Sequence, residues 1–367
     1  MPPRSQRKSV TVQDVAKEAN VSVATVSRAI SNPEVVSVQT LQRVQAAIVR
    51  TGYRVNHTAR NLRRKTSGAV LVQVPNLGNP FFSQILAALN AAFAKSGYVV
   101  LVSDTAVLDA PGRQAVDYLL DGRVDGVVCL DCSMAGEDLA SINNTALEHN
   151  IVFACEWIEG TSHASVRSNN ARGAWLAVDH LHALGHRQIA HITGPADNVL
   201  TLARREGFTD AINTLALPRK DDWIIHGDFS AGSGWTAAEA ILAMQDPPTA
   251  VFCASDMIAL GLISGLRAAG IAVPDDISIV GFDDIELTSY SEPALTTIRQ
   301  DRTALGERAA HHLLQALGHD GEQATAQVEI VDVSLVCRAS CAPPRTQTTA
   351  RSALAPPTAN IPTASAQ

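Results

Sequence analysis

Two kinds of hydrophobic pattern divide the chain. In residues 11–30 and again in 37–52, apolar side chains recur three and four positions apart, as they do on one face of a helix. From residue 69 to residue 282, short apolar runs alternate with stretches of helical period. Continuous apolar strands between helices indicate parallel sheets covered on both faces. The pattern therefore predicts a small all-α head followed by a larger α/β body.

The first stretch predicts two short helices joined by a tight turn. Thr11 is a good N-cap, Asp14 suits the positive end of the first helix, and Asn20 tolerates the left-handed conformation of a helix exit. Ser22 is expected to cap the second helix. This is the pattern of a helix-turn-helix, although any small helical hairpin shares it. The residues expected on the buried side of the second helix are Val23, Val26 and Ile30.

Charge supports nucleic-acid binding by the head. Residues 1–66 contain 12 Lys and Arg against 3 Asp and Glu, whereas the rest of the chain contains 17 against 33. The net charge of −7 hides this division. A basic end on an acidic body favours contact with a phosphate backbone through that end only.

The segment between head and body is predicted to form a hinge that orders on DNA. Arginines surround one large apolar residue, Leu62, which suits a wedge between base steps of the minor groove. A solvated linker is the alternative explanation of such a charge run. The expected division of the chain is a disordered arm at 1–9, a helix-turn-helix domain at 10–55, a hinge helix at 56–67, a two-lobed core at 68–341 and a disordered tail at 342–367.

Motifs of other functional classes are missing. The sequence has no P-loop, no G-x-S-x-G, no H-E-x-x-H and no G-x-G-x-x-G after a strand, so we predict neither an enzyme nor a cofactor. Cys129 and Cys132 form a lone C-x-x-C, and scattered cysteines in apolar stretches suit buried thiols. His182 and His186 are four residues apart and could share a metal, but solvated or hydrogen-bonded histidines are the commoner case, and we predict no metal.

The sequence shows no membrane span and no secretory signal after the basic start, so we expect a cytoplasmic protein. Two α/β lobes around a cleft also suit a free solute-binding protein of sugar or nucleoside uptake. Such a protein would need export and would not need the basic head.

Blocks between residues 10 and 338 resemble the LacI/GalR family of bacterial transcription regulators. VTVQDVAKEANVSVATVSRAI resembles its DNA-binding signature and TARNLRRKTSG its hinge, while NPFF, RVDGVV, SDMIALG and VPDDISIVGFDDI resemble its core blocks. The resemblance implies a periplasmic-binding-protein-like core in a homodimer, sometimes a tetramer. Such a repressor binds a near-palindromic double-stranded operator, and a small effector between the lobes changes its DNA affinity. The chain is also expected to return to the first lobe after Arg299.

The same resemblance suggests the DNA contacts. Val23, Ala24 and Arg28 match base-contacting positions, and Thr25 and Ser27 lie among phosphate contacts. Arg28 alone can hydrogen-bond to a base edge; the other two offer apolar contact to a thymine methyl group, or simply pack in the head. The predicted set is Thr11, Ser22, Val23, Ala24, Thr25, Ser27, Arg28, Asn56, Arg60, Asn61 and Leu62.

Effector contacts are implied in the same way. Two aromatic rings and several polar groups could stack on and orient a small flat molecule, although both phenylalanines could equally belong to the core. The family's usual Val-Asp-Asn at the lobe boundary is replaced here by Arg167, Ser168 and Asn169, which removes a carboxylate that often binds sugar hydroxyls. Several blocks look most like a nucleoside-responsive member, so we expect a nucleoside, with a sugar or a purine base as the alternative. The predicted effector contacts are Phe82, Arg204, Phe229, Asp256, Asp283 and Gln300.

Overall fold

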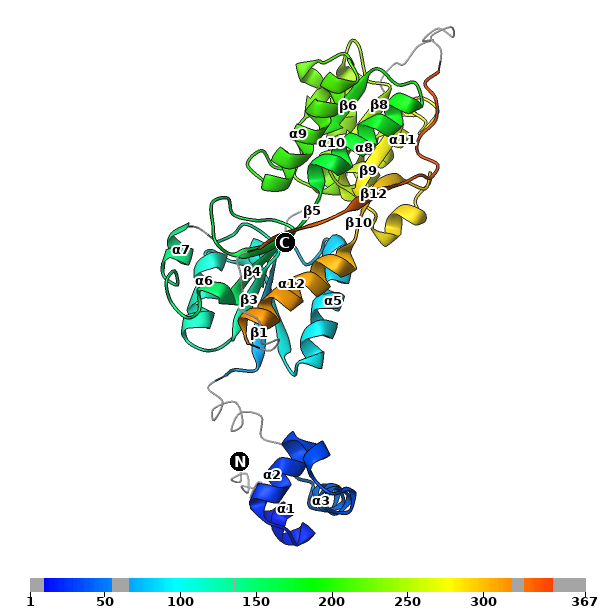
Figure 1. Cartoon of the computed structure of the whole chain (residues 1–367). Helices are drawn as coiled ribbons and strands as arrows, with labels where there is room; N and C mark the ends of the chain where they lie inside the picture. The colour runs from blue at the N-terminus through cyan, green and yellow to red at the C-terminus, as the bar shows by residue number, and fades with distance from the viewer. Residues whose placement is uncertain (1–9, 55–65, 135, 319–326, 346–367) are drawn as a thin grey trace, which may run out of the picture. The chain divides into compact units, whose positions relative to one another are not determined.

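The chain forms two compact units that meet between Ser67 and Gly68 (Figure 1). The computed structural model describes residues 10–54, 66–134, 136–318 and 327–345. The predicted arm and most of the predicted hinge therefore lie outside the described residues. In the part of the chain that is described, no helix is long and apolar enough to cross a membrane.

The head is a three-helix domain. Its helices are α1 (Val12–Ala19), α2 (Val23–Ser31) and α3 (Val38–Thr51), with a short 3-10 turn η1 (Pro33–Val35) after α2. The predicted caps are confirmed: Asn20 is left-handed with φ 52°, and the Ser22 side chain accepts a hydrogen bond from the Thr25 backbone N–H at 3.1 Å. The buried side chains of the head are Val15, Ala16, Ala19, Val26, Ala29, Val44 and Ala47.

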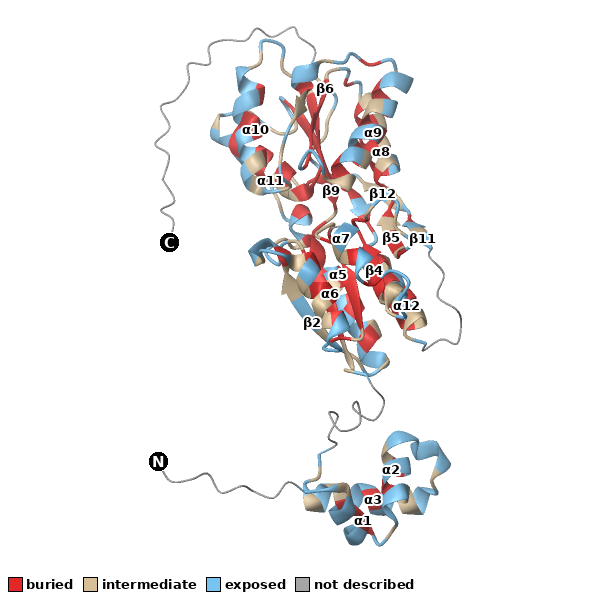
Figure 2. Cartoon of the chain, turned by 90° about the vertical axis from the view of Figure 1, so that its left-hand side faces the viewer, coloured by how far each residue is buried: buried red, intermediate tan, exposed pale blue. Residues whose placement is uncertain are grey.

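The core consists of two lobes, each built on a six-stranded sheet with helices on both faces (Figure 2). Every described strand pair is parallel except β10 with β12. The first sheet has the order β11 (Val328–Val331), β5 (Ala164–Ser168), β4 (Ile151–Ala154), β3 (Gly126–Cys129), β1 (Ala69–Val74) and β2 (Val99–Asp104). The second has the order β12 (Val333–Val336), β10 (Thr296–Gln300), β9 (Ser278–Asp283), β8 (Ala250–Cys253), β6 (Ile189–Ile192) and β7 (Ile224–Ile225).

Helices cover both faces of each sheet, which is why the central strands read as continuous apolar runs. In β1, residues 70–74 are all buried. The helices of the first lobe are α5 (Phe81–Lys95) and α12 (Arg302–Ala316) on one face, and α6 (Pro111–Leu120) and α7 (Gly136–Ala140) on the other. Those of the second lobe are α8 (Asn170–Ala183) and α9 (Val199–Thr214) on one face, and α10 (Ala231–Ala243) and α11 (Asp256–Ala268) on the other. The remaining 3-10 turns are η2 (Thr105–Val107), η3 (Glu148–Asn150), η4 (Asp221–Trp223) and η5 (Glu286–Ser289).

The chain crosses between the lobes three times, after β5, after β10 and between β11 and β12. The expected return to the first lobe after Arg299 is confirmed, because α12 packs on α5 and β11 pairs with β5. The hydrophobic pattern did not predict β5, β10, α12, β11 or β12. β12 pairs antiparallel with β10, and so brings the chain back to the second lobe.

The predicted start of the disordered tail at residue 342 is wrong for the first four residues. The Ala342 carbonyl accepts hydrogen bonds from His186 Nε2 at 2.9 Å and from Ser278 Oγ at 3.0 Å. Arg345 forms ion pairs with Asp275 and Asp276. These polar contacts hold a segment whose composition carries no hydrophobic period. Residues 346–367 lie outside the described part of the chain.

Candidate DNA-binding and effector sites

Helix α2 carries an exposed side that can face DNA. Its predicted contacts Ala24, Ser27 and Arg28 are exposed, together with the cap Ser22, while Thr25 is partly buried. The opposite side packs into the head through Val26 and Ala29. The head therefore fixes this helix by one face and leaves the other free.

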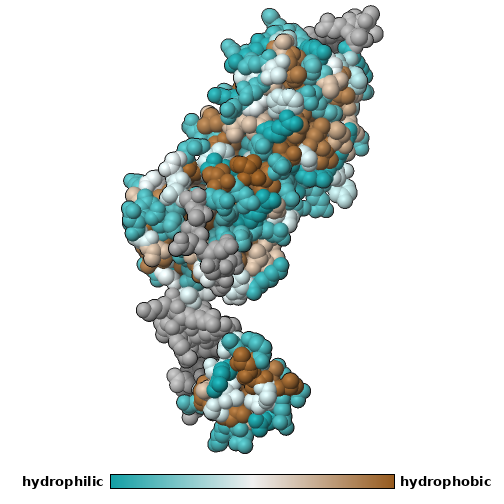
Figure 3. All heavy atoms as spheres, in the orientation of Figure 1, coloured by the Kyte–Doolittle hydropathy of each residue, from teal (hydrophilic) through white to brown (hydrophobic). Residues whose placement is uncertain are grey.

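The prediction that Val23 is buried is wrong. Its side chain is 42% exposed, because it is the first residue of α2 and lies at the end of the packed part of the head. Ala29 takes the buried place instead. Figure 3 shows hydrophobic side chains on the surface of the head. An exposed valine at the start of α2 is available for contact with a thymine methyl group.

Arg28 is available for a base edge. Its Nε lies 3.5 Å from the Ala24 carbonyl oxygen, and no ion pair to a carboxylate holds it among the described residues. Thr11 is engaged in capping, because its backbone N–H and its hydroxyl both donate to Asp14 Oδ2 at 2.8 Å. Four predicted contacts, Asn56, Arg60, Asn61 and Leu62, lie outside the described residues.

A cavity of about 420 Å³ lies between the two lobes of the core. Its lining includes residues that directly follow strands, such as Pro75 after β1 and Leu130 after β3. This is the edge at which ligands bind to open α/β sheets. Four of the six predicted effector residues line this cavity: Phe82, Arg204, Phe229 and Asp283.

Arg204 is a fixed, buried cation in the cleft. Its Nε donates to Asn170 Oδ1 at 2.9 Å, and its Nη1 donates to the Ala254 carbonyl. The guanidinium carbon lies 3.9 Å from the ring centroid of Phe282 and 5.7 Å from that of Phe229. Burial lowers the pKa of Arg204, and the nearby Asp283 opposes this shift. Its hydrogen bonds to Asn170 and Ala254 both come from the second lobe.

Asp283 supplies a carboxylate beside this cation. Its Oδ1 accepts a hydrogen bond from Gln300 Nε2 at 2.7 Å. Burial raises the pKa of Asp283 to about 6, although Arg204 and the hydrogen bond favour the charged form. Its backbone is left-handed, with φ 124°. Such strain in a non-glycine residue is typical of functional positions.

The structure places the other two predicted effector residues behind the lining. Gln300 holds Asp283, as described above. Asp256 is fully buried and accepts hydrogen bonds from Thr297 Oγ1 at 2.5 Å and from the Ile285 backbone N–H at 2.9 Å. Burial, reinforced by the charge of Asp283, raises the pKa of Asp256 well above its usual value. Both residues position the wall of the cleft.

Sequence reasoning missed a second carboxylate, Glu156. It lines the cleft, is 9% exposed, and accepts hydrogen bonds from Asn198 Nδ2 at 2.7 Å and from the Cys132 backbone N–H at 3.1 Å. Burial raises its pKa. Glu156 directly follows the apolar run at 151–155. This position could have identified it in the sequence, because residues at the carboxyl ends of parallel strands line such clefts.

The substituted Val-Asp-Asn segment does not line this cleft. Arg167 instead places its guanidinium carbon 4.3 Å from the ring centroid of Trp157 and donates to Ser165 Oγ at 2.9 Å. The lining keeps the carboxylates of Glu156 and Asp283. The missing Asp therefore leaves the cleft acidic, and it is no argument against a sugar.

The two phenylalanines differ. Phe82 is buried in the hydrophobic core of the first lobe and also touches the cleft. Phe229 is partly exposed and left-handed at φ 66°, and its carbonyl accepts a hydrogen bond from Ser255 Oγ at 3.3 Å. Its ring lies against Gly194, where a Cβ atom would come within 2.1 Å of the ring. Phe229 therefore owes its place in the cleft to a glycine.

Three of the four cysteines and histidines considered in the sequence, Cys129, Cys132 and His186, have hydrogen-bond partners inside the fold. Cys132 donates to the Trp157 carbonyl at 3.1 Å, and burial raises the pKa of both Cys129 and Cys132. His186 is buried and hydrogen-bonded to Thr249 Oγ1 at 2.9 Å as well as to the tail. Within the described ranges, no group of three or more His, Cys, Asp or Glu could hold a metal ion.

Comparison with known proteins shows similarity along almost the whole chain. Residues 11–56 match the model for bacterial regulatory proteins of the lacI family, and residues 178–341 match a periplasmic binding protein-like domain. The chain is 35% identical over 340 residues to the HTH-type transcriptional repressor CytR of Escherichia coli (strain K12), which covers 93% of this chain and 98% of that protein. It is 33% identical over 331 residues to the HTH-type transcriptional repressor PurR of Actinobacillus pleuropneumoniae serotype 3 (strain JL03), with 90% and 98% covered.

Solved structures agree. The Lac repressor dimer bound to operator and the anti-inducer ONPF matches with a TM-score of 0.77 and 33% identity, covering 91% of this chain and 100% of that one. A LacI family transcriptional regulator from Enterococcus faecium with bound ribose matches with a TM-score of 0.67 and 27% identity, covering 76% and 100%. The helical head and the two-sheet core thus match known members over almost the whole chain, and the chain belongs to the lacI family of bacterial regulatory proteins.

Proposed function

We propose that the protein is a transcriptional repressor that binds operator DNA as a homodimer and changes its operator affinity when a small molecule occupies the interlobe cleft. The observation that supports this function most directly is the combination of an exposed helix-turn-helix face with a cleft that holds a buried cation and two carboxylates. The two relatives named above are transcriptional repressors. Since the operator of a bacterial repressor lies in the cytoplasm, we place the protein there.

DNA recognition follows from the exposed side of α2. In the major groove, Arg28 donates two hydrogen bonds to a guanine, while Val23 and Ala24 contact a thymine methyl group. Thr25 and Ser27 contact phosphates. Two heads in a dimer bind the two halves of a near-palindromic site, and we assign residues 56–67 to a hinge that orders on that site.

The cleft suits a nucleoside. Phe229 offers a ring face for the base, and Arg204 offers a fixed cation next to it. Glu156 and Asp283 accept hydrogen bonds from ribose hydroxyls. A cavity of about 420 Å³ is within the usual range for small-molecule sites. A sugar is the second candidate, because both carboxylates remain in the lining.

The effector acts only through a difference in affinity between two arrangements of the core. Both induction and corepression satisfy this condition. The cleft is lined from both lobes, by Phe82 and Glu156 on one side and by Arg204 and Phe229 on the other. A ligand that contacts both sides therefore favours one spacing of the lobes.

The test begins with selection of a binding site from random DNA by the full-length protein. Affinity for the selected site is then measured by fluorescence anisotropy with and without cytidine, adenosine, hypoxanthine or ribose. We expect one of these ligands to change the operator affinity at least tenfold. Phe229→Ala should shift this response to at least threefold higher ligand concentration and leave the affinity of the ligand-free protein for DNA unchanged. A chain that selects no DNA but binds one of the ligands would instead be a solute-binding protein.

A further inference from the structure

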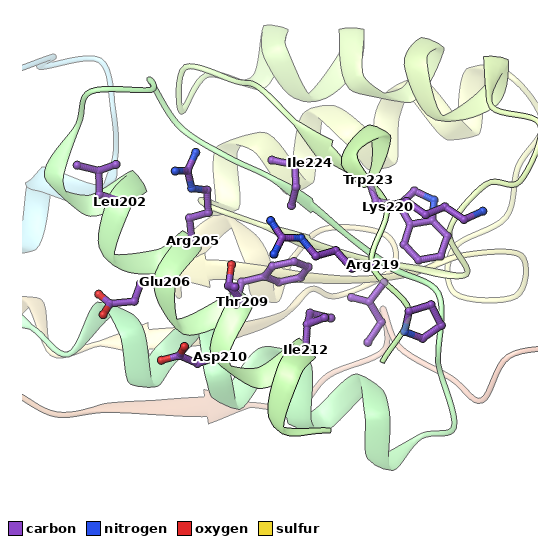
Figure 4. Close-up of a pocket in the computed structure, with 13 residues that line it drawn as sticks. Leu202, Arg205, Glu206, Thr209, Asp210, Ile212, Arg219, Lys220, Trp223 and Ile224 are labelled. Atoms are coloured by element: carbon purple, nitrogen blue, oxygen red, sulfur yellow. The ribbon is translucent and has the colours of Figure 1, made fainter. Parts of the chain in front are cut away.

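A second cavity, of about 480 Å³, lies on the outer side of the second lobe (Figure 4). It is formed between α9 and the segment 218–224, and it shares no lining residue with the interlobe cleft. Its apolar wall includes Phe208 and Ile189, which are almost fully buried, and Ile224. All of the lining residues belong to the second lobe.

Three cations line this pocket, and two of them are uncompensated. Lys220 is paired with Asp246 and lies over the ring of Trp223, with Nζ 4.9 Å from the centroid. Arg205 and Arg219 have neither an ion pair nor a hydrogen bond from their guanidinium groups among the described residues. Both line the pocket. Their charges therefore remain available to a ligand.

The nearby carboxylates do not neutralise these arginines. Glu206 and Asp210 also line the pocket, but Figure 4 shows their carboxylates directed away from the two guanidinium groups. No ion pair within 4.0 Å joins either acid to Arg205 or Arg219. The side chain of Arg219 extends across the pocket in the direction of Arg205 (Figure 4). Two positive charges that face the same pocket attract an anion to the space between them.

We propose that this pocket binds a small amphipathic anion. A carboxylate or phosphate group lies between Arg205 and Arg219, which present planar, fixed forks of N–H donors to such groups. An apolar ring or chain of the same ligand covers Ile224 and Leu202, which is 47% exposed. A polyanion such as DNA is disfavoured at this pocket, because the chain beyond residue 66 carries 33 acidic against 17 basic residues.

Helix α9 connects this pocket to the effector cleft. Arg204 lines the cleft, and the next residue, Arg205, lines the second pocket. A ligand in the second pocket thus contacts the same helix that fixes the cleft cation. This connection rests on the proposed effector site, whereas the binding of an anion does not.

The experiment titrates full-length protein at low ionic strength with phenyl phosphate, benzoate, inorganic phosphate and benzyl alcohol, by ligand-observed NMR and calorimetry. We expect saturable binding of phenyl phosphate or benzoate, at least tenfold weaker binding of inorganic phosphate, and no binding of benzyl alcohol. The double variant Arg205→Gln/Arg219→Gln should weaken the binding at least tenfold. Both residues are exposed, so we expect its unfolding temperature to match that of the wild type.

Two control variants locate the ligand. Arg267→Gln removes an exposed arginine from α11, on the other face of the second sheet, and should leave the affinity unchanged. Phe229→Ala alters the interlobe cleft and should also leave it unchanged. No saturable binding of either aromatic anion, equal affinity for inorganic phosphate, or loss of binding in Phe229→Ala but not in the double variant would each overturn the proposal. If the anion binds while no nucleoside or sugar does, the anion site is supported and the proposal of a nucleoside or sugar effector is contradicted.

Discussion

Replacing Gly194 by alanine tests whether the position of the Phe229 ring controls effector binding. A Cβ atom at residue 194 would lie 2.1, 2.4 and 2.5 Å from three carbons of that ring. Ordinary contacts begin near 3.4 Å. The ring therefore has to move by about 1 Å or more, since packed atoms cannot share this space.

The energetic consequence falls on binding as well as on folding. Phe229 is partly exposed and the clash meets the outer end of its ring, but the residue also packs against two hydrophobic clusters of the core, so we expect Gly194→Ala to lower the free energy of unfolding by about 1 kcal/mol. A displaced ring loses its stacking on the base, which is worth about 0.5 to 1.5 kcal/mol beyond the buried area. We therefore expect effector affinity to fall about threefold to tenfold or more.

Calorimetry with the effector that the wild type binds measures this loss, and urea unfolding measures the stability. Phe229→Ala serves as the matched variant, because it removes the same ring without a clash at residue 194. The two variants should weaken binding by similar factors. Unchanged effector affinity in Gly194→Ala would show that the ring does not stack on the ligand, and a large loss of stability would show that it belongs to the core.

Three further predictions concern the DNA face and the cleft acid. Arg28→Ala should weaken operator binding by about 1 to 3 kcal/mol and relax base preference at one position per half-site, as measured on single-base operator variants; equal losses on all sequences would mean that Arg28 only holds phosphate. Operator affinity should fall steeply between about 50 and 200 mM salt, with a log-log slope of about −0.9 for each phosphate contact, and a flat response contradicts phosphate contact by the head. Burial raises the pKa of Asp283 to about 6, so the folded state binds this proton more tightly than the unfolded state does. The stability that protonated Asp283 contributes is therefore complete below about pH 4 and is lost as the pH rises through 6. Urea unfolding from pH 4 to 7 should therefore show wild type losing about 1 to 3 kcal/mol relative to Asp283→Asn, and parallel pH profiles of the two proteins would count against a raised pKa.

Local signals explain why the elements of the head could be predicted. Its caps depend on single side chains, such as Ser22 and the left-handed Asn20, and these act within three residues along the chain. Most central strands up to β9 were equally visible, because burial on both faces demands a run of apolar residues, whereas β5 was missed. The exception is Val23. The hydrophobic period predicts which side of a helix is buried, but it does not predict how far along the helix the packing of its neighbours extends.

Two of the missed strands, β11 and β12, lie at the edges of their sheets. β5 and β11 pair across more than 160 residues, and β11 reads VEIV with only one buried residue. Edge strands of this kind need no continuous apolar run, so hydrophobicity does not mark them. Residues 342–345 were missed for a related reason, because polar contacts of the His186 ring and of Arg345 hold them.

The candidate cleft could be predicted in part, and the division has a physical basis. Phe82, Arg204, Phe229 and Asp283 line it, whereas Asp256 and Gln300 support it from behind. Sequence alone does not distinguish a buried acid that faces a cavity from one that faces the protein interior. That distinction depends on which backbone N–H groups and hydroxyls surround the carboxylate.

The cleft is coupled to the crossing between the lobes through two consecutive residues. Asp283 faces the cavity, and Asp284 accepts hydrogen bonds from Arg299 Nε and Arg338 Nη2 at 2.6 Å each. Both have positive φ, 124° and 57°, so neither backbone rests in its preferred region. The Asp284 carbonyl also accepts a hydrogen bond from Arg302 Nη2 at 2.7 Å, and Arg302 is the first residue of α12 in the other lobe. We therefore expect a ligand that holds the Asp283 carboxylate to act on this link between the lobes, and to have different affinities for different lobe arrangements, which is the condition for an effector to change operator binding.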